Sequence, residues 1–173
     1  MKLKWIGLCV LLIAGCNSTK DLDVISGFEP ERYMGVWYEI ARFPHGFEEG
    51  MSNVTATYSL NQDGSISVIN RGYIDEKQEW KKAEAHAKLK GPPSEGWLKV
   101  SFFKPFYGSY KIISLDDDYS RAIVTAGSYN YLWLLAREPQ LTEETYTAMV
   151  QRAGELGFET GKLIPVDQSQ HIQ

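Results

Sequence analysis

The chain has 173 residues, of which 43% are hydrophobic, and a formal net charge of −4. This length suits one ordinary domain. No run of basic residues occurs, which argues against nucleic acid as a partner. Both cysteines, Cys9 and Cys16, lie near the start of the chain, so we expect no disulfide in a domain that follows them.

The first 16 residues have the pattern of a secretory signal that ends at a cysteine. Lys2 and Lys4 precede an apolar run over residues 5–14, which is too short for a membrane span of about 20 residues. Residues 12–16, LIAGC, resemble the lipobox of bacterial lipoproteins. That resemblance implies that residues 1–15 are removed and that Cys16 carries acyl chains, which together form a stable anchor. An ordinary signal with a chance cysteine is the alternative.

Removal of residues 1–15 would leave one domain with a formal net charge of −6, because two of the 18 basic side chains and none of the 22 acidic ones are lost. By resemblance, Asn17 favours delivery to the outer membrane, and we expect the protein to face the periplasm. We expect a signal peptide over residues 1–15, a lipid anchor and tether over residues 16–27, and a folded domain over residues 28–173.

Short segments of alternating apolar and polar residues follow one another from residue 35 onward. Joined by short loops, they predict an all-β fold, an antiparallel up-and-down sheet. Closure into a barrel removes the exposed sheet edges, and eight strands leave room for one small ligand. A flat two-sheet sandwich with a packed core is the alternative. The predicted strands cover residues 35–43, 54–60, 66–71, 80–89, 96–103, 109–115, 122–128 and 131–137.

One α-helix is predicted near the C-terminus, over residues 142–156. Thr142 can cap its start, and Gly157 is placed to end it. Its apolar residues recur at helical spacing and form one stripe. Because a small barrel cannot hold a helix inside, we expect this stripe to pack on the outside, over Leu132, Leu134, Tyr38 and Ile40.

Three short motifs of one protein family occur here in that family's order. Gly35 and Trp37 match the opening G-x-W, Asp116 and Tyr119 resemble the second motif, and Arg137 matches the third. The chain is therefore similar to the lipocalins, and the lipobox narrows the match to their bacterial outer-membrane members. The resemblance implies that Trp37 closes the narrow end of an eight-stranded barrel and that Arg137 lies across its ring.

The inward face of the predicted barrel carries small and apolar side chains. In the fourth strand the polar residues share one parity, so Ala83, Ala85 and Ala87 should face inward and leave empty volume. The same reasoning predicts a cavity for a long apolar molecule with a small polar end. The predicted cavity residues are Ala41, Val54, Ala56, Tyr58, Val68, Asn70, Ala83, Ala85, Ala87, Val100, Phe102, Tyr110, Ile112 and Trp133.

Two further features at this cavity leave alternatives open. Glu39 shares the parity of Trp37, and if it points inward it could pair with a buried arginine or meet a ligand's head. The first loop, residues 44–53, carries Phe47 and Met51. These suit either a lid or membrane-facing entrance, or a loop whose Phe47 folds back on the barrel.

The sequence favours a binding protein over an enzyme. The three histidines, His45, His86 and His171, lack metal-ligand spacing, and no free cysteine remains as a nucleophile. We therefore expect no metal, no cofactor and no catalytic residue. The expected partners are a membrane and a small lipophilic ligand such as a fatty acid or lysophospholipid, carried or stored in the cell envelope. An enzyme acting on a carotenoid or quinone is the alternative, and a homodimer is left open.

Overall fold

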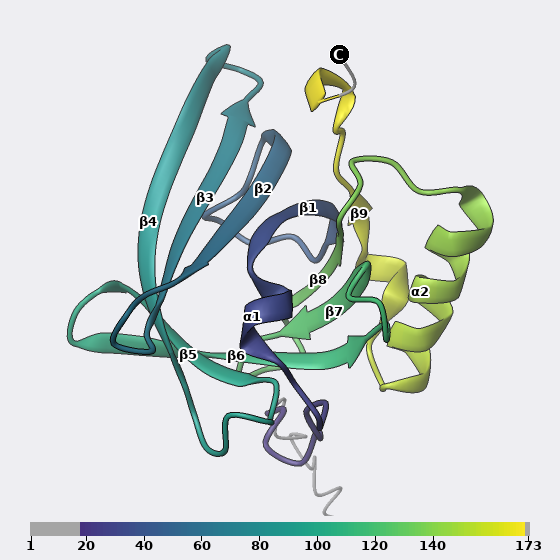
Figure 1. Ribbon diagram of the computed structural model, residues 1–173. Helices are drawn as coiled ribbons and strands as arrows, with labels where there is room; N and C mark the ends of the chain where they lie inside the picture. Colours follow the sequence, from purple (N-terminus) through teal and green to yellow (C-terminus); the bar gives the residue numbers. More distant parts are fainter. Residues whose placement is uncertain (1–17, 172–173) are drawn as a thin grey trace, which may run out of the picture.

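The computed structural model describes residues 18–171 and folds them into a closed antiparallel barrel (Figure 1). Each of eight strands pairs with the next, and the eighth pairs with the first. The predicted barrel is therefore confirmed, and the alternative of a flat two-sheet sandwich is not. The strands are β1 (Gly35–Arg42), β2 (Met51–Leu60), β3 (Ile66–Ile74), β4 (Glu79–Leu89), β5 (Trp97–Phe103), β6 (Phe106–Leu115), β7 (Arg121–Thr125) and β8 (Leu132–Ala136).

The structure also contains several short elements that the sequence did not predict. A ninth strand, β9 (Ile164–Pro165), pairs with the end of β1. The helix α1 (Pro30–Tyr33) precedes the barrel, and two 3-10 turns, η1 (Thr160–Lys162) and η2 (Ser169–His171), follow the long helix. Near the end of the chain, the buried Gln168 side chain donates hydrogen bonds to the carbonyl oxygens of Glu39 and Val54. The C-terminal segment thereby ties β1 to β2.

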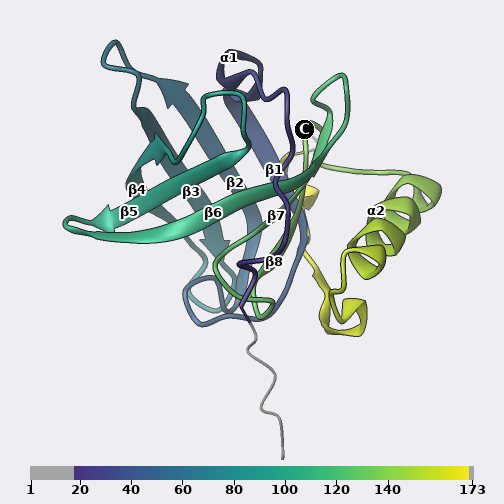
Figure 2. The ribbon, with the colours of Figure 1, turned by 90° about the horizontal axis from the view of Figure 1, so that it is seen from below.

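The long helix α2 (Glu143–Glu155) packs against the outside of the barrel, as its apolar stripe predicted (Figures 1 and 2). Thr142 caps it, since its Oγ1 accepts a hydrogen bond from the Thr145 backbone N–H at 3.2 Å. Gly157 follows with a φ of +91°, a left-handed conformation that favours glycine. The helix and the barrel wall share a buried cluster of Met149, Ala153, Phe158, Ala41, Phe43, Ile113, Ile123, Leu132 and Leu134.

Trp37 and Arg137 seal one end of the barrel. The Trp37 ring is fully buried, and its Nε1 donates a hydrogen bond to the Tyr33 carbonyl at 2.9 Å. The Arg137 guanidinium lies 4.0 Å from the centroid of the Trp37 ring, a cation–π contact. It also donates hydrogen bonds to the carbonyls of Val36 and Arg32, at 2.8 and 2.9 Å. The closed end is thus held by packing and by backbone carbonyls together.

The strand connections alternate between the two ends of the barrel because neighbouring strands are antiparallel. Trp37 is the third residue of β1, so the start of β1 marks the closed end. Figure 2 shows α1 at this end. The loops β1–β2, β3–β4, β5–β6 and β7–β8 therefore lie at the other end, which we call the mouth. The β1–β2 loop is shorter than predicted, because β2 already begins at Met51. Asn53 has a φ of +53° where the register of β2 shifts, so the alternation becomes regular only after it.

Residues 18–27 lie against the barrel, where the sequence predicted a tether. Ser18 pairs with Ser128 in the β7–β8 loop. Further along, the Ile25 N–H donates to the Ile112 carbonyl at 3.0 Å, and the Ile25 carbonyl accepts from Gly96 at 3.0 Å. Gly96 makes this approach possible, since a Cβ there would lie 2.5 Å from Ile25 Cγ1. The ordered domain thus includes residues before position 28.

The predicted signal peptide and Cys16 lie outside the described residues. Across residues 18–171, no helix has both the length and the apolar character that a membrane span requires.

Candidate ligand-binding site

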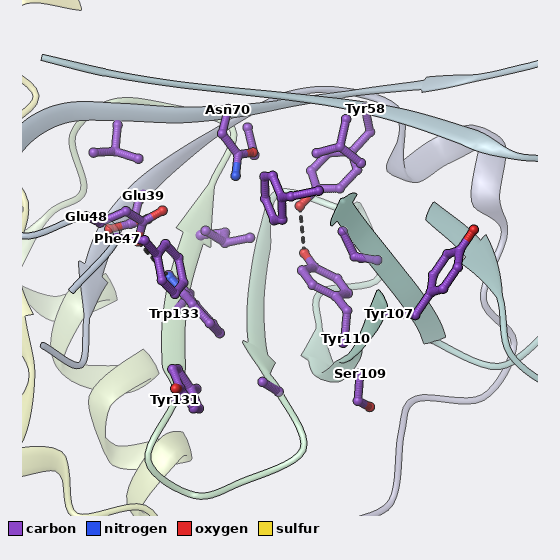
Figure 3. Close-up of a pocket in the computed structure, with 18 of the residues that line it drawn as sticks. Glu39, Phe47, Glu48, Tyr58, Asn70, Tyr107, Ser109, Tyr110, Tyr131 and Trp133 are labelled. Atoms are coloured by element: carbon purple, nitrogen blue, oxygen red, sulfur yellow. Dashed lines mark hydrogen bonds between the residues drawn. The ribbon is translucent and has the colours of Figure 1, made fainter. Parts of the chain in front are cut away.

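A cavity of about 560 Å³ lies inside the barrel on the side of the mouth (Figure 3). This volume falls within the range of about 300–1,000 Å³ that is usual for small-molecule sites. Loops contribute to its rim: Phe47 and Glu48 come from the β1–β2 loop, and Ala126 and Tyr131 come from the β7–β8 loop. The rest of the wall comes from the inward faces of the strands and is mainly apolar and aromatic.

Nine of the residues predicted from the alternating pattern line this cavity. The pattern succeeds because successive residues of a strand face opposite sides of the sheet. Most of these residues are apolar or aromatic, and Asn70 adds a polar amide to the tyrosine hydroxyls. Figure 3 shows the Asn70 side chain directed into the cavity. The nine residues are Val54, Ala56, Tyr58, Val68, Asn70, Val100, Phe102, Tyr110 and Trp133.

The three alanines of β4 share the inward face but do not line the cavity that the structure forms. Ala83 pairs with Asn70 and Ala85 with Val68, and directly paired residues share a face of the sheet. Ala87 is fully buried in the core cluster at the closed end.

Ile112 is also fully buried in that core cluster. Together with Ala87 it therefore fills the closed end and leaves the ligand volume nearer the mouth.

Ala41 faces the opposite way from its predicted direction. The register of β1 against β8 shifts between Glu39 and Ala41, and such an irregularity reverses the alternation beyond it. Ala41 consequently packs in the cluster beneath α2 and not in the cavity. Ile40, which lies at the shift, and Tyr38 were also predicted to lie under α2, but neither is part of that cluster.

The shift also brings Arg42 to the side of Glu39. Arg42 Nη1 donates a hydrogen bond to Glu39 Oε1 at 2.7 Å, and both side chains are 5% exposed. Arg42 Nη2 donates to the Glu48 and Met51 carbonyls, at 2.7 and 3.1 Å. Of the two alternatives for an inward Glu39, pairing with a buried arginine is the one found. Arg42 was missed because a residue three positions away normally lies on the other face of a strand.

Glu48 extends this buried pair into the cavity wall. Its Oε2 accepts a hydrogen bond from Trp133 Nε1 at 3.1 Å and lies 2.9 Å from His45 Nε2. Phe47 stacks on the His45 ring with centroids 4.0 Å apart. Phe47 is nevertheless 53% exposed, so it lies on the rim, over the cavity, with one side open to solvent. These contacts fix the β1–β2 loop to the wall.

Burial dominates the electrostatics of Glu39. It raises the pKa of the Glu39 carboxyl well above its ordinary value, and the charge of Glu48 adds to this effect, while the nearby Arg42 lowers it. The mouth side of the cavity therefore carries acidic, hydrogen-bonding groups.

Three tyrosine hydroxyls form a chain at the other side of the cavity. The Tyr110 hydroxyl is hydrogen-bonded to that of Tyr33 at 2.8 Å. It is also hydrogen-bonded to that of Tyr58 at 2.9 Å, a contact drawn in Figure 3. Burial is the main cause that raises the pKa of all three, that of Tyr58 to about 12. The hydroxyls therefore stay neutral and offer hydrogen bonds to a ligand.

Sequence reasoning largely missed a group of aromatic residues at the end of the β5–β6 hairpin. These residues line the cavity. Phe103, Phe106 and Tyr107 join the predicted Phe102 there. The strand β6 was predicted to begin only at residue 109, because the Lys104–Pro105 step interrupts the alternation. The unusual density of aromatic residues over positions 102–107 was the signal that could have revealed them.

Within the part of the chain that the structure describes, no three His, Cys, Asp or Glu side chains are placed to hold a metal ion.

The chain matches the family model described as a lipocalin-like domain over residues 28–168. It belongs to the lipocalin family. The motifs at Trp37 and Arg137 had already indicated this resemblance, and the match confirms it.

Bacterial lipocalins are among the relatives of this chain. It is 48% identical to outer membrane lipoprotein Blc of Citrobacter freundii over 160 residues, which cover 91% of this chain and 90% of that protein. It is 46% identical to outer membrane lipoprotein Blc of Vibrio cholerae over 163 residues, which cover 93% and 95%. Among solved structures, insecticyanin from the tobacco hornworm Manduca sexta has a TM-score of 0.71 at 18% identity, with 87% and 86% of the chains covered. That last likeness shows the shared fold alone.

Proposed function

We propose that this lipocalin is anchored in the outer membrane, where it binds and carries or stores long apolar lipids such as fatty acids or lysophospholipids. The observation that carries the proposal is the cavity of about 560 Å³ with its mainly apolar and aromatic wall. Each CH₂ group removed from water contributes about 0.8 kcal/mol. A long acyl chain thus supplies enough free energy to offset the cost of association, which is about 4–15 kcal/mol.

The polar groups of the cavity suit the small polar end of such a ligand. Among the described residues, none donates a hydrogen bond to the buried Oδ1 of Asn70. A ligand hydroxyl or ammonium group that donates to it would satisfy this atom. Glu48 near the mouth and the Tyr110 hydroxyl deeper inside offer further partners. An amphiphile can therefore bury its chain and keep its polar end hydrogen-bonded.

The location rests on the lipobox and on the relatives. Two relatives that are 46–48% identical are named outer membrane lipoproteins, and Cys16 follows the sequence LIAG. We therefore propose Cys16 as the lipid attachment site and the periplasmic side of the outer membrane as the location. Both the family and these names favour binding, so the enzyme considered as the alternative is not proposed.

A cavity-filling substitution tests the binding function. Ala56 lines the cavity, so Ala56→Trp should occupy space that a ligand needs and should weaken the binding of a fluorescent fatty acid at least about tenfold, or about 1.4 kcal/mol. Because the ring enters open space, the loss of stability should stay below the about 1–3 kcal/mol of overpacking in a filled core. Ser59→Trp, at an exposed position of the same strand, is the control and should bind normally. Saturable binding that Ala56→Trp leaves unchanged would contradict the proposed site.

A further inference from the structure

The described chain begins at the rim of the cavity. Ser18 pairs with Ser128 in the β7–β8 loop, and Thr19 Oγ1 donates a hydrogen bond to the Ala126 carbonyl at 2.7 Å. Lys111 Nζ donates to the Thr19 carbonyl at 2.6 Å, and Thr19 is 1% exposed. Ala126 itself lines the cavity. Residues 18 and 19 are therefore fixed beside the mouth.

This attachment limits the distance between the mouth and a lipid on Cys16. Only Asn17 separates Cys16 from Ser18. Whatever their conformation, two residues span at most about 7 Å. Acyl chains on Cys16 enter the bilayer, so the membrane surface must lie close to the β7–β8 side of the mouth. A barrel held far from the membrane by a long tether is not compatible with this geometry.

The hairpin between β5 and β6 exposes aromatic side chains next to the same cavity. Phe103 is 80% exposed and Phe106 is 77% exposed, and Phe102 and Tyr107 are also exposed. All four line the cavity, so the exposed apolar surface continues into the ligand site. Figure 2 shows this hairpin reaching outward from the barrel wall. Large exposed apolar patches on soluble proteins usually mark a protein or membrane contact.

The chemistry of the hairpin favours a lipid surface. Aromatic side chains are enriched where membranes meet water, and Lys104 lies between Phe103 and Phe106 at the tip, with Lys99 nearby over the Tyr107 ring. Lysine side chains next to inserted aromatic rings can contact the phosphate groups of lipids. The mouth-side location of the hairpin and of Ser18 then allows one tilted membrane plane to contact both.

We propose that the tip of the β5–β6 hairpin, residues 102–107, is a membrane-contact surface that holds the mouth of the barrel against the bilayer. An apolar ligand then passes between the bilayer and the cavity along the aromatic side chains without crossing water. The inference rests on the proposed lipid anchor at Cys16, and it adds an orientation to the proposed binding function.

Depth measurements on the full-length lipidated protein test this orientation. Cys16 carries the lipids and Cys9 leaves with the signal, so a single introduced cysteine can be labelled with a polarity-sensitive fluorophore. The test variant is Phe103→Cys, and Phe106→Cys repeats it at a second position. The control is Gln62→Cys, in the β2–β3 turn at the closed end. The proteins are placed in vesicles of phosphatidylethanolamine and phosphatidylglycerol, with and without a quencher on the lipid acyl chains.

We expect the labels at positions 103 and 106 to shift to shorter wavelength and to be quenched several-fold more strongly than the label at position 62. Equal quenching at positions 103, 106 and 62 would overturn the inference. A wavelength shift without quenching would also overturn it, because the label would then lie in an apolar protein environment and not in lipid. Vesicle flotation is measured for each labelled protein, and binding of a fluorescent fatty acid is measured in parallel for the protein without introduced cysteines. If flotation and fatty acid binding are normal while quenching is absent, the orientation fails and the proposed function stands. If the protein does not float, the anchor fails and the orientation with it.

Discussion

Replacing Arg42 by methionine removes the buried cation between the two acidic residues of the cavity wall. Arg42 donates to Glu39 at 2.7 Å and also holds the backbone of the β1–β2 loop through the Glu48 and Met51 carbonyls. Both Arg42 and Glu39 are buried, so water cannot replace the lost partner. Arg42→Met should therefore be strongly destabilising, although methionine fills a similar volume.

The size of the effect follows from this burial. Two opposite charges about 4 Å apart attract by about 4 kcal/mol at an effective dielectric constant of 20, and breaking a buried ion pair typically costs about 3–5 kcal/mol. For a domain of this size each kcal/mol lowers the melting temperature by about 2–4 °C. We therefore expect a fall of roughly 6–20 °C. Urea denaturation followed by Trp fluorescence gives the free energy of unfolding, and calorimetry gives the melting temperature.

The pH dependence and a second substitution make this prediction specific. Without Arg42, the Glu39 carboxyl must be protonated to remain buried, so the deficit should be larger at about pH 8 than at about pH 5. Adding Glu39→Gln removes the unpaired acid and should restore part of the lost stability. A deficit below about 1 kcal/mol, the level of an exposed ion pair, would refute the reasoning. So would a deficit that is independent of pH and unaffected by Glu39→Gln.

Three further predictions concern other parts of the molecule. Trp37→Ala removes a fully buried ring on which Arg137 lies. It should lower the free energy of unfolding, measured by urea denaturation, by about 3–5 kcal/mol. The control is Trp80→Ala, at a half-exposed position, and equal losses would mean that Trp37 does not hold the closed end. Burial raises the folded-state pKa of Glu39, so its contribution to stability is present at low pH and is lost as the pH rises through that raised pKa. Glu39→Gln should therefore flatten this part of the plot of unfolding free energy against pH. An unchanged plot would assign the slope to other groups. Cys16→Ala should abolish labelling by a radioactive fatty acid and leave an unprocessed or soluble form, whereas undiminished label would exclude Cys16 as the attachment site.

The alternating pattern was sufficient to predict the barrel and much of the cavity wall, and the apolar stripe of α2 was sufficient to predict its position outside the barrel. The alternating pattern could not predict the irregularity in β1, because no residue type near Ile40 marks a register shift. The consequence is local but large, since it turns Ala41 outward and brings Arg42 beside Glu39. The sequence therefore indicated only one member of the buried ion pair, Glu39, which shares the inward-facing alternation of Trp37.

The other missed features depend on contacts between distant parts of the chain. The polar residues 17–20 suggested a tether that continues to residue 27. The docking of this segment requires the space at Gly96 and the backbone groups of Ile112. The aromatic hairpin was missed in part because the Lys104–Pro105 step breaks the alternation on which the prediction relied. Local pattern thus determines the strands, whereas tertiary contacts determine how the mouth is built.

Identification of the molecule inside the barrel is the most direct test of lipid binding. The full-length protein would be extracted from membranes with a mild detergent and examined by native mass spectrometry, followed by lipid analysis of what it releases. We predict about one apolar or amphiphilic lipid with a long acyl chain per barrel, displaced by a fluorescent fatty acid and absent from Ala56→Trp. A wild-type barrel that is recovered empty and takes up no added fatty acid or lysophospholipid would contradict the proposal that the cavity is a lipid-binding site.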